Sequence, residues 1–151
     1  MKTFDTLAEL SAQVGTTIAV SDWLLVTQEQ IRLFAQATGD QQWIHVDPER
    51  AAKGPFGTTV AHGFLTLSLI PQFLESSLAM GDVQMSVNCG LNKVRFVAPV
   101  PVMSRLRAHF KLLATELLER GGVQQIWEVT VEIEGHKKPA CVAELVLRQY
   151  V

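Results

Sequence analysis

The sequence predicts a single α+β domain in which one long buried helix is wrapped by a curved antiparallel sheet. Three observations support this fold class: the length of the chain, one strongly apolar helical segment near its middle, and strand patterns after that segment. The chain has 151 residues, and chains of about 100 to 200 residues usually form one domain with a continuous core. We therefore expect one domain that spans residues 1–151.

Two shorter helices are predicted before the central segment. Thr27 begins a capping-box pattern that is followed by apolar residues at helical spacing, and Gly39 supplies a stop. Asp47 is a second candidate N-cap, and Pro48 suits the first helical position after it. Residues 39–46 are therefore expected to form a loop held between two helices.

The central segment runs from Gly63 to about Met80 and has a helical pattern that is apolar almost all round at its start. Gly81 then ends the pattern. Its most apolar run is followed at once by Pro71, well short of the roughly 20 residues that a membrane span needs. We expect a helix that is buried inside the protein, and no membrane partner.

The second half of the chain alternates apolar and polar residues as half-exposed strands do. This period of two appears in Val102–Leu112 and again in Val123–Ile133. Gly121-Gly122 is expected to join these two strands as a hairpin. With further strands at Leu91–Val97 and Ala140–Tyr150, about four long antiparallel strands are available to wrap the helix.

The composition excludes some classes of function. The formal net charge is −2, which leaves no basic footprint for nucleic acid. The first residues lack the apolar stretch of a secretory signal, so we expect a cytoplasmic protein. The two cysteines, Cys89 and Cys141, are expected to be free thiols, because a chain that builds its own core needs no disulfide.

Asp40 and His45 form the most informative pair in the sequence, because they lie five residues apart within the predicted loop. That spacing separates two side chains by roughly 140° on a helix and sends them to opposite faces of a strand. Only an irregular turn can bring them together, and together they could position a water molecule and move protons near neutral pH. The spacing alone leaves open that Asp40 caps a local turn and that His45 is an ordinary hydrogen-bonded histidine.

Gly63 begins the central helix and is preceded by Ala61 and His62, of which Ala61 cannot cap it. Unless Thr58 or Thr59 folds back, the first amide N–H groups lack a side-chain partner. Such donors suit a developing oxyanion. The alternative is that Gly63 only allows the backbone to pack closely and that His62 is a hydrogen-bonded, half-buried residue.

These motifs resemble a known family. Phe34–Ala51, with Thr38-Gly39-Asp40 followed by Ile44-His45, is similar to the signature of the MaoC-like (R)-specific enoyl-CoA hydratases. Ala61–Phe64 matches the start of that family's central helix, and Asn88–Phe96 looks like the strand that follows the helix. The resemblance covers most of the chain, and two motifs in the right order make it specific.

The resemblance implies a hot-dog fold and a hydratase or dehydratase that acts on a trans-2-enoyl or (R)-3-hydroxyacyl thioester. It implies that Asp40 and His45 are the catalytic pair and that the Gly63 N–H is the oxyanion donor. Where the usual signature has Asn-Pro, this chain has Gln42-Trp43, as does a subset of the family that resembles nodulation protein N.

Six further residues are candidates for substrate binding. Lys93 and Arg95 could hold the phosphates of coenzyme A, although a solvated strand face would look the same. Ser68 lies within the central helix, where a hydroxyl usually bonds back to a carbonyl one turn earlier. The full set is His62, Phe64, Ser68, Asn88, Lys93 and Arg95.

The sequence also leads to expectations about the substrate carrier, metals, alternative functions and assembly. The substrate would be a thioester of coenzyme A or of acyl carrier protein, with no cofactor. No metal is expected, because the four histidines are scattered without a ligand spacing. A hot-dog thioesterase and a non-catalytic acyl-thioester-binding subunit remain alternatives, since fold does not fix function. A homodimer is expected, because a lone sheet of this kind leaves strand edges unpaired.

Overall fold

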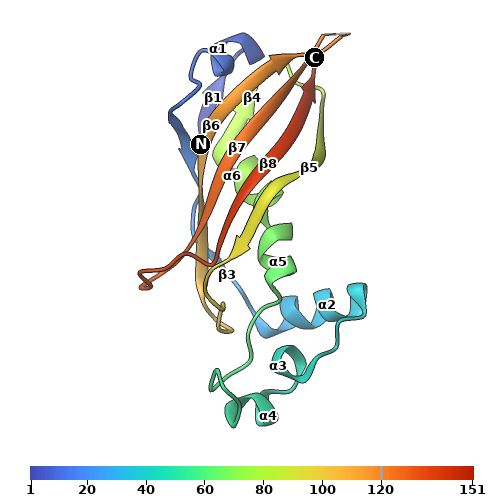
Figure 1. Ribbon diagram of the computed structural model, residues 1–151, viewed down its shortest axis with the longest axis vertical. Coiled ribbons are helices and arrows are strands. Elements are labelled where there is room, and N and C mark those ends of the chain that lie inside the picture. The colour runs from blue at the N-terminus through green and yellow to red at the C-terminus, as the bar shows by residue number, and fades with distance from the viewer. Residues whose placement is uncertain (120) are drawn as a thin grey trace.

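The protein consists of a long curved sheet with a central helix on its inner side, and a group of short helices at one end (Figure 1). The structure, a computed structural model, describes residues 1–119 and 121–151. The predicted α+β class, with a curved antiparallel sheet around a central helix, is confirmed. In chain order the elements are β1 (Lys2–Phe4), α1 (Leu7–Ser11), β2 (Thr17–Val20), β3 (Leu24–Leu25), α2 (Gln28–Thr38), α3 (Trp43–Val46), α4 (Pro48–Ala52), α5 (Gly63–Ser68), α6 (Ile70–Ser77), β4 (Leu78–Met80), β5 (Met85–Phe96), β6 (Arg105–Leu117), β7 (Gly122–Ile133) and β8 (Cys141–Tyr150).

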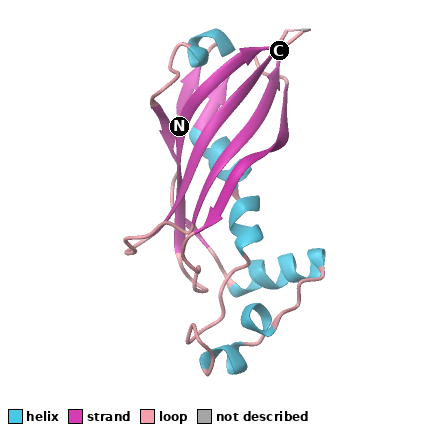
Figure 2. Cartoon of the chain, in the orientation of Figure 1, coloured by secondary structure: helices cyan, strands magenta, loops and turns pink. Residues whose placement is uncertain are grey.

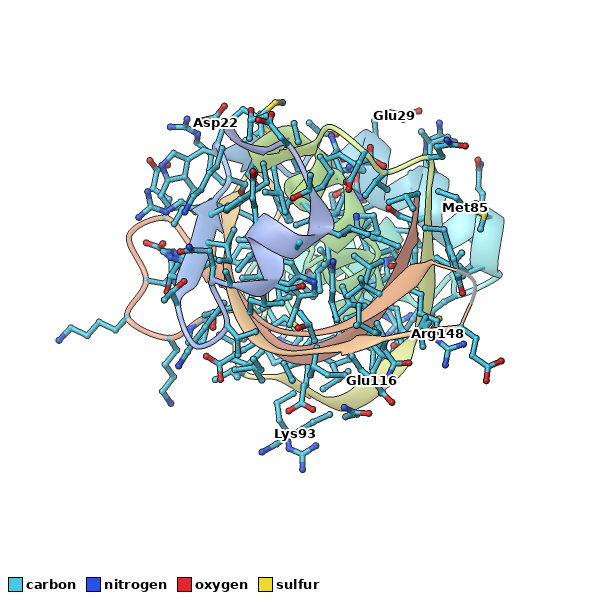
Figure 3. All side chains as sticks on the ribbon, turned by 90° about the horizontal axis from the view of Figure 1, so that it is seen from above. Asp22, Glu29, Met85, Lys93, Glu116 and Arg148 are labelled. Atoms are coloured by element: carbon cyan, nitrogen blue, oxygen red, sulfur yellow. The ribbon has the colours of Figure 1, made fainter. Side chains whose placement is uncertain are left out.

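The main sheet has the strand order β2-β6-β7-β8-β5, and β3 also pairs with β6. All of its pairs are antiparallel. The four long strands are those that the alternation predicted, and Gly122 begins the second strand of the expected hairpin. Their inward residues form the core. There the rings of Phe110 and Trp127 pack edge to face, with their centroids 6.3 Å apart. Figure 3 shows the sheet curving around the helices.

The strand bounds differ from the prediction at two places. β5 begins at Met85 rather than at Leu91, so it pairs with the whole of β8. β6 begins only at Arg105, because the backbone at Val102 and Met103 bonds to other segments. Met103 also has a φ of 65°, which is incompatible with a strand.

The central helix is divided, so the expectation of one helix from Gly63 to about Met80 is wrong. α5 and α6 meet at Leu69, and Pro71 lies in the first turn of α6. Proline has no N–H and its ring crowds the carbonyl four residues earlier, which interrupts a helical ladder. After α6 the chain extends at Leu78 as β4, which pairs in parallel with β1.

The three helices α2, α3 and α4 gather beyond one end of the sheet, next to the start of α5 (Figure 2). The predicted caps of α2 and α4 are confirmed: the Thr27 hydroxyl accepts from the Gln30 N–H, and the Asp47 carboxylate accepts from the Arg50 N–H. The loop expected between them is in part the one-turn helix α3. This end of the molecule positions the candidate site.

Two further features bear on the expectations. None of the helices in the described residues is both long and apolar enough to cross a membrane. Cys141 is buried and Cys89 is exposed, and both are free thiols. Burial raises the pKa of the Cys141 thiol to about 11.

Candidate functional site

Asp40, His45 and His62 come together at the end of the sheet, each offering a side-chain atom within 4.8 Å of the others. Gly39 ends α2 with a φ of 81°, which turns the chain into Asp40. The Asp40 Oδ1 then accepts a hydrogen bond of 3.4 Å from the Gln42 N–H, where α3 begins. This irregular turn brings side-chain atoms of Asp40 and His45 within 4.8 Å of each other, which neither a helix nor a strand could do at this spacing.

The His45 imidazole is buried and held in one tautomer. Its Nδ1 lies 2.6 Å from the carbonyl oxygen of Val60. A carbonyl can only accept, so Nδ1 carries the proton and Nε2 keeps its lone pair. Burial lowers the pKa of His45 from its usual range, and the neighbouring His62 lowers it further, whereas the bond to Val60 and the charge of Asp40 act in the opposite direction. The ring therefore offers an unprotonated Nε2 near neutral pH, as a general base requires.

The Asp40 carboxylate lies at the solvent edge of this group. Its side chain is 55% exposed, and its Oδ2 is 4.0 Å from the His62 Nε2. An exposed carboxylate near the buried imidazole of His45, whose Nε2 is unprotonated, can hold a water molecule and share its protons. The separate roles of Asp40 and His45 stay predictions.

Gly63 follows directly and opens α5. The residue before it, His62, makes no side-chain cap. Thr59 does not fold back, because its hydroxyl donates to the Gln28 side chain. We find no hydrogen bond from the Gly63 N–H to any other residue that the structure describes. A side chain at Gly63 would put its Cβ 2.9 Å from the Phe96 ring, so this glycine also permits close packing.

Gln28 is a supporting residue that the sequence analysis missed. Its Nε2 donates to the backbone oxygen of His45 at 2.8 Å, while its Oε1 accepts from Thr59. It therefore joins α2 to α3 and to the segment before α5. A glutamine in the first turn of a capped helix looks like an ordinary surface residue in the sequence, so no local signal marked it.

Of the Gln42-Trp43 pair, Trp43 takes part in packing, and Gln42 contacts Asp40 through its backbone. The Trp43 ring packs against Gly54, where an added Cβ would lie 2.9 Å from the ring. The Arg50 guanidinium lies 4.5 Å from the centre of the same ring. Trp43 thus ties α3 to α4 and to the turn after α4. Gln42 still donates its backbone N–H to Asp40.

Two of the predicted substrate-binding residues share a hollow. Ser68 and Asn88 line a cavity of about 270 Å³ with apolar neighbours that include Leu91 and Leu145. The Ser68 hydroxyl bonds back to the Phe64 carbonyl at 2.7 Å, as expected for a serine inside a helix. Phe64 itself is 68% exposed.

Lys93 and Arg95 are not brought together with Asp40 and His45. They lie opposite Glu144 and Val142 of β8 on the outer side of the sheet, and Figure 3 shows Lys93 pointing away from the body of the chain. With Glu144 they line a separate hollow of about 290 Å³. That Lys93 and Arg95 bind the same ligand as Asp40 and His45 stays a prediction.

The structure brings together three side chains that could bind a metal, although their spacing in the sequence did not indicate a metal site. The positions of Asp40, His45 and His62 in the sequence match no metal-binding motif, yet their donor atoms lie within 4.8 Å of one another. One nitrogen of each imidazole already faces a backbone carbonyl. Carboxylate and imidazole groups are also metal ligands, so the expectation of no metal stays a prediction.

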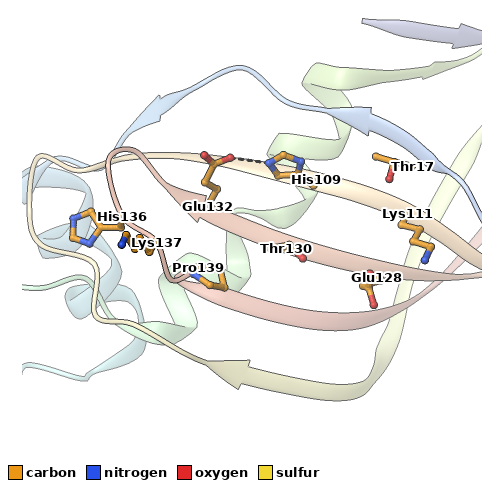
Figure 4. A pocket seen from close by; sticks show the side chains of 9 residues that line it. All are labelled: Thr17, His109, Lys111, Glu128, Thr130, Glu132, His136, Lys137 and Pro139. Carbon is orange, nitrogen blue, oxygen red and sulfur yellow. Dashed lines mark hydrogen bonds and ion pairs between the residues drawn. The ribbon is translucent and has the colours of Figure 1, made fainter.

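The outer face carries a further polar hollow, of about 420 Å³, which His109 and His136 line together with charged and polar neighbours (Figure 4). The His109 Nε2 is 2.8 Å from a carboxylate oxygen of Glu132, which Arg107 also contacts. Both partners lower the pKa of Glu132, Arg107 more than His109. Because these charges satisfy one another, the hollow has the character of a solvated sheet face.

Comparison with known proteins finds similar chains along nearly the whole length. Residues 9–133 match the family described as MaoC like domain. The chain is 55% identical to 3-hydroxyacyl-thioester dehydratase Z of Mycobacterium tuberculosis, over 98% of both chains. It is 44% identical to nodulation protein N of Rhizobium leguminosarum bv. viciae, over 91% of this chain and 86% of that protein. The solved R-hydratase PhaJ1 from Pseudomonas aeruginosa shares the fold, with a TM-score of 0.71 and 22% identity over 93% of this chain and 84% of that one.

Proposed function

We propose that this chain, which belongs to the MaoC-like domain family, catalyses the reversible hydration of a trans-2-enoyl thioester to an (R)-3-hydroxyacyl thioester. The observation that carries the proposal is the convergence of side-chain atoms of Asp40 and His45 within 4.8 Å, with the Nδ1 of His45 bonded to the Val60 carbonyl so that Nε2 is unprotonated. The relative with 55% identity is named a 3-hydroxyacyl-thioester dehydratase, which describes the reverse of the same reaction. The motifs predicted this family from the sequence.

The chemistry divides between an acid–base pair and an oxyanion donor. A water molecule held by Asp40 and His45 loses a proton to the pair, and its oxygen forms a bond to C3 of the enoyl group. The electron pair of the C2–C3 double bond then forms a double bond between C1 and C2, and the carbonyl electron pair moves onto the thioester oxygen, where the Gly63 N–H stabilises the negative charge. The pair then returns a proton to C2, which completes the addition of one water molecule. These groups all belong to the protein, so the proposed reaction requires no cofactor.

The carrier of the acyl group is coenzyme A or acyl carrier protein. Relatives named for 3-hydroxyacyl-thioester and 3-hydroxybutyryl-CoA dehydration support a thioester substrate. The hollow lined by Ser68 and Asn88 begins about one turn of α5 beyond Gly63. An acyl chain whose thioester oxygen meets the Gly63 N–H would have this apolar space beside it.

The test is incubation with enoyl-CoA thioesters of graded chain length while the absorbance of the conjugated double bond is followed. Hydration removes that absorbance, and Asp40→Asn should abolish most of the loss. Asp47→Asn is the matched control, because Asp47 lies in the same segment but caps α4, and asparagine caps equally well.

Free thiol is measured in the same reactions. Release of thiol from a saturated acyl-CoA without hydration would contradict the proposal and favour a thioesterase. Binding of acyl-CoA with no turnover at any chain length would favour a non-catalytic subunit.

A further inference from the structure

His62 is the most buried of the three converging side chains Asp40, His45 and His62. Only 3% of the residue is exposed. Its ring stacks on His45 with centroids 3.8 Å apart and an angle of 23°, and Phe34 of α2 packs against it at 5.0 Å. Three segments of the chain, α2, α3 and the start of α5, therefore meet at this one ring.

The hydrogen bond of His62 determines which ring nitrogen holds its proton. Nε2 lies 3.0 Å from the backbone oxygen of Asp40. A carbonyl only accepts, so Nε2 is protonated and donates. The other nitrogen, Nδ1, is buried and has no hydrogen-bond partner among the described residues. A proton on Nδ1 would leave a buried donor unpaired, which is costly, so the ring is held as the Nε2–H tautomer.

The same residue is joined to all three groups that the proposed reaction uses. It bonds to the backbone of Asp40, it stacks on the ring of His45, and its own peptide bond carries the Gly63 N–H. A rotation of the ring would shift these groups relative to one another. With its ring covered on both sides, His62 has little surface left for a ligand.

We propose that His62 is a positioning residue, which holds Asp40 and His45 at the correct distance from the Gly63 N–H through its Nε2–H bond and its stacked ring. This role differs from the substrate binding that the sequence suggested for His62. The inference rests on the proposed function, because the distance matters only if the three groups act on one substrate.

Two variants separate the hydrogen bond from the ring. His62→Phe keeps a flat ring between Phe34 and His45 but removes the donor to Asp40. His62→Gln keeps an amide N–H at about the position of Nε2 but removes the stacking ring. His136→Gln is the control, since His136 lies on the outer face.

The expected result is a split between kcat and KM. His62→Phe should lower kcat for a short enoyl-CoA by about ten- to a hundred-fold, the scale of a misplacement near 1 Å, with KM within about threefold of wild type. His62→Gln should recover most of that kcat, because it restores the bond to Asp40. A higher KM with unchanged kcat in His62→Phe would overturn the proposal in favour of substrate binding. Loss of turnover in both variants to the level of Asp40→Asn would overturn it in favour of direct proton transfer.

Long-range proton–nitrogen NMR spectra of the ¹⁵N-histidine-labelled wild type provide a readout that does not depend on turnover. We expect the His62 signals of an Nε2–H tautomer, and a Nδ1–H tautomer would overturn the proposal even if His62→Phe failed to fold. Spectra of His62→Gln should retain the Nδ1–H tautomer of His45. If the wild type hydrated no enoyl-CoA, the proposed function would fail by itself, while these spectra would still decide how His62 is held.

Discussion

At the scale of single residues, the site depends on two side chains that no regular element could bring together. The turn after Gly39 and the short helix α3 point both Asp40 and His45 toward one position. The Val60 carbonyl and the Gln28 amide then hold His45 from two sides, at its ring and at its backbone. We propose that a pair held in this way acts on one water molecule, so its members should not contribute independently.

We therefore expect Asp40→Asn and His45→Gln each to lower turnover of a short enoyl-CoA by at least about a hundred-fold. The double variant should resemble the worse single variant, because residues that act as one unit are strongly non-additive. Steady-state kinetics on folded proteins, with Asp47→Asn as control, measures this. Multiplying effects in the double variant would show that the two residues act separately.

The lowered pKa of His45 predicts how stability and activity depend on pH. In the unfolded chain a histidine titrates near pH 6.5, so on acidification the unfolded chain takes up this proton before the folded chain does. The stability that comes from neutral His45 is therefore complete above about pH 6.5 and decreases below it.

Urea unfolding at about pH 7.5 and about pH 5.5 should show a larger loss of stability in the wild type than in His45→Gln. The acid limb of kcat/KM should correspondingly have its midpoint below about pH 6.5. An equal loss in both proteins, or an acid limb above that pH, would contradict the assignment.

At the scale of elements, the site depends on how closely the start of α5 approaches the end of β5. Gly63 lies against the Phe96 ring, where no side chain fits, and this contact places the Gly63 N–H. A simple Gly63→Pro variant would remove the N–H but would also clash with Phe96, so its activity would be ambiguous.

A matched pair in a Phe96→Ala background removes that ambiguity. Gly63→Ala then retains the N–H, and Gly63→Pro removes it at a first helical position that suits proline. We expect the proline variant to turn over about a hundred- to a thousand-fold more slowly than the alanine variant, the cost of one oxyanion donor. Equal turnover in two folded proteins would rule out this role for the N–H.

At the scale of the whole molecule, β5 is an edge strand that a single chain leaves open. Its side chains are mostly exposed and include large apolar ones: Met85, Val87, Leu91 and Phe96. Unpaired strand edges with apolar side chains favour association with another strand. A second copy of this chain could pair its own β5 there about a twofold axis.

We expect sedimentation velocity to show a dimer at assay concentrations. Val87→Glu, in β5, should weaken the dimer by at least about tenfold, because it places a charge in the paired edge. Val20→Glu is the matched control, since Val20 is similarly exposed but lies in β2, at the other edge of the sheet. A stable wild-type monomer would contradict the expectation.

Features that depend only on neighbouring residues could be predicted from the sequence. The caps at Thr27 and Asp47 and the alternation in the long strands are local, so they could be predicted. The spacing of Asp40 and His45 showed only that an irregular turn would be needed to bring them together, and it left open an ordinary cap and a hydrogen-bonded histidine. The break at Pro71 also has a local cause, because proline lacks an N–H. The apolar pattern continues on both sides of it, and this continuity favoured one unbroken helix.

The contacts between distant segments could not be predicted, because they form only when the whole chain packs. The pairing of β1 with β4, the bond from Gln28 to His45, and the packing of His62 on Asp40 and His45 each join parts of the chain that packing alone brings together. The outward position of Lys93 depends in the same way on the register of β5 against β8. Periodicity reports which face of an element is apolar, but which segment covers that face is decided by the shape of the whole core.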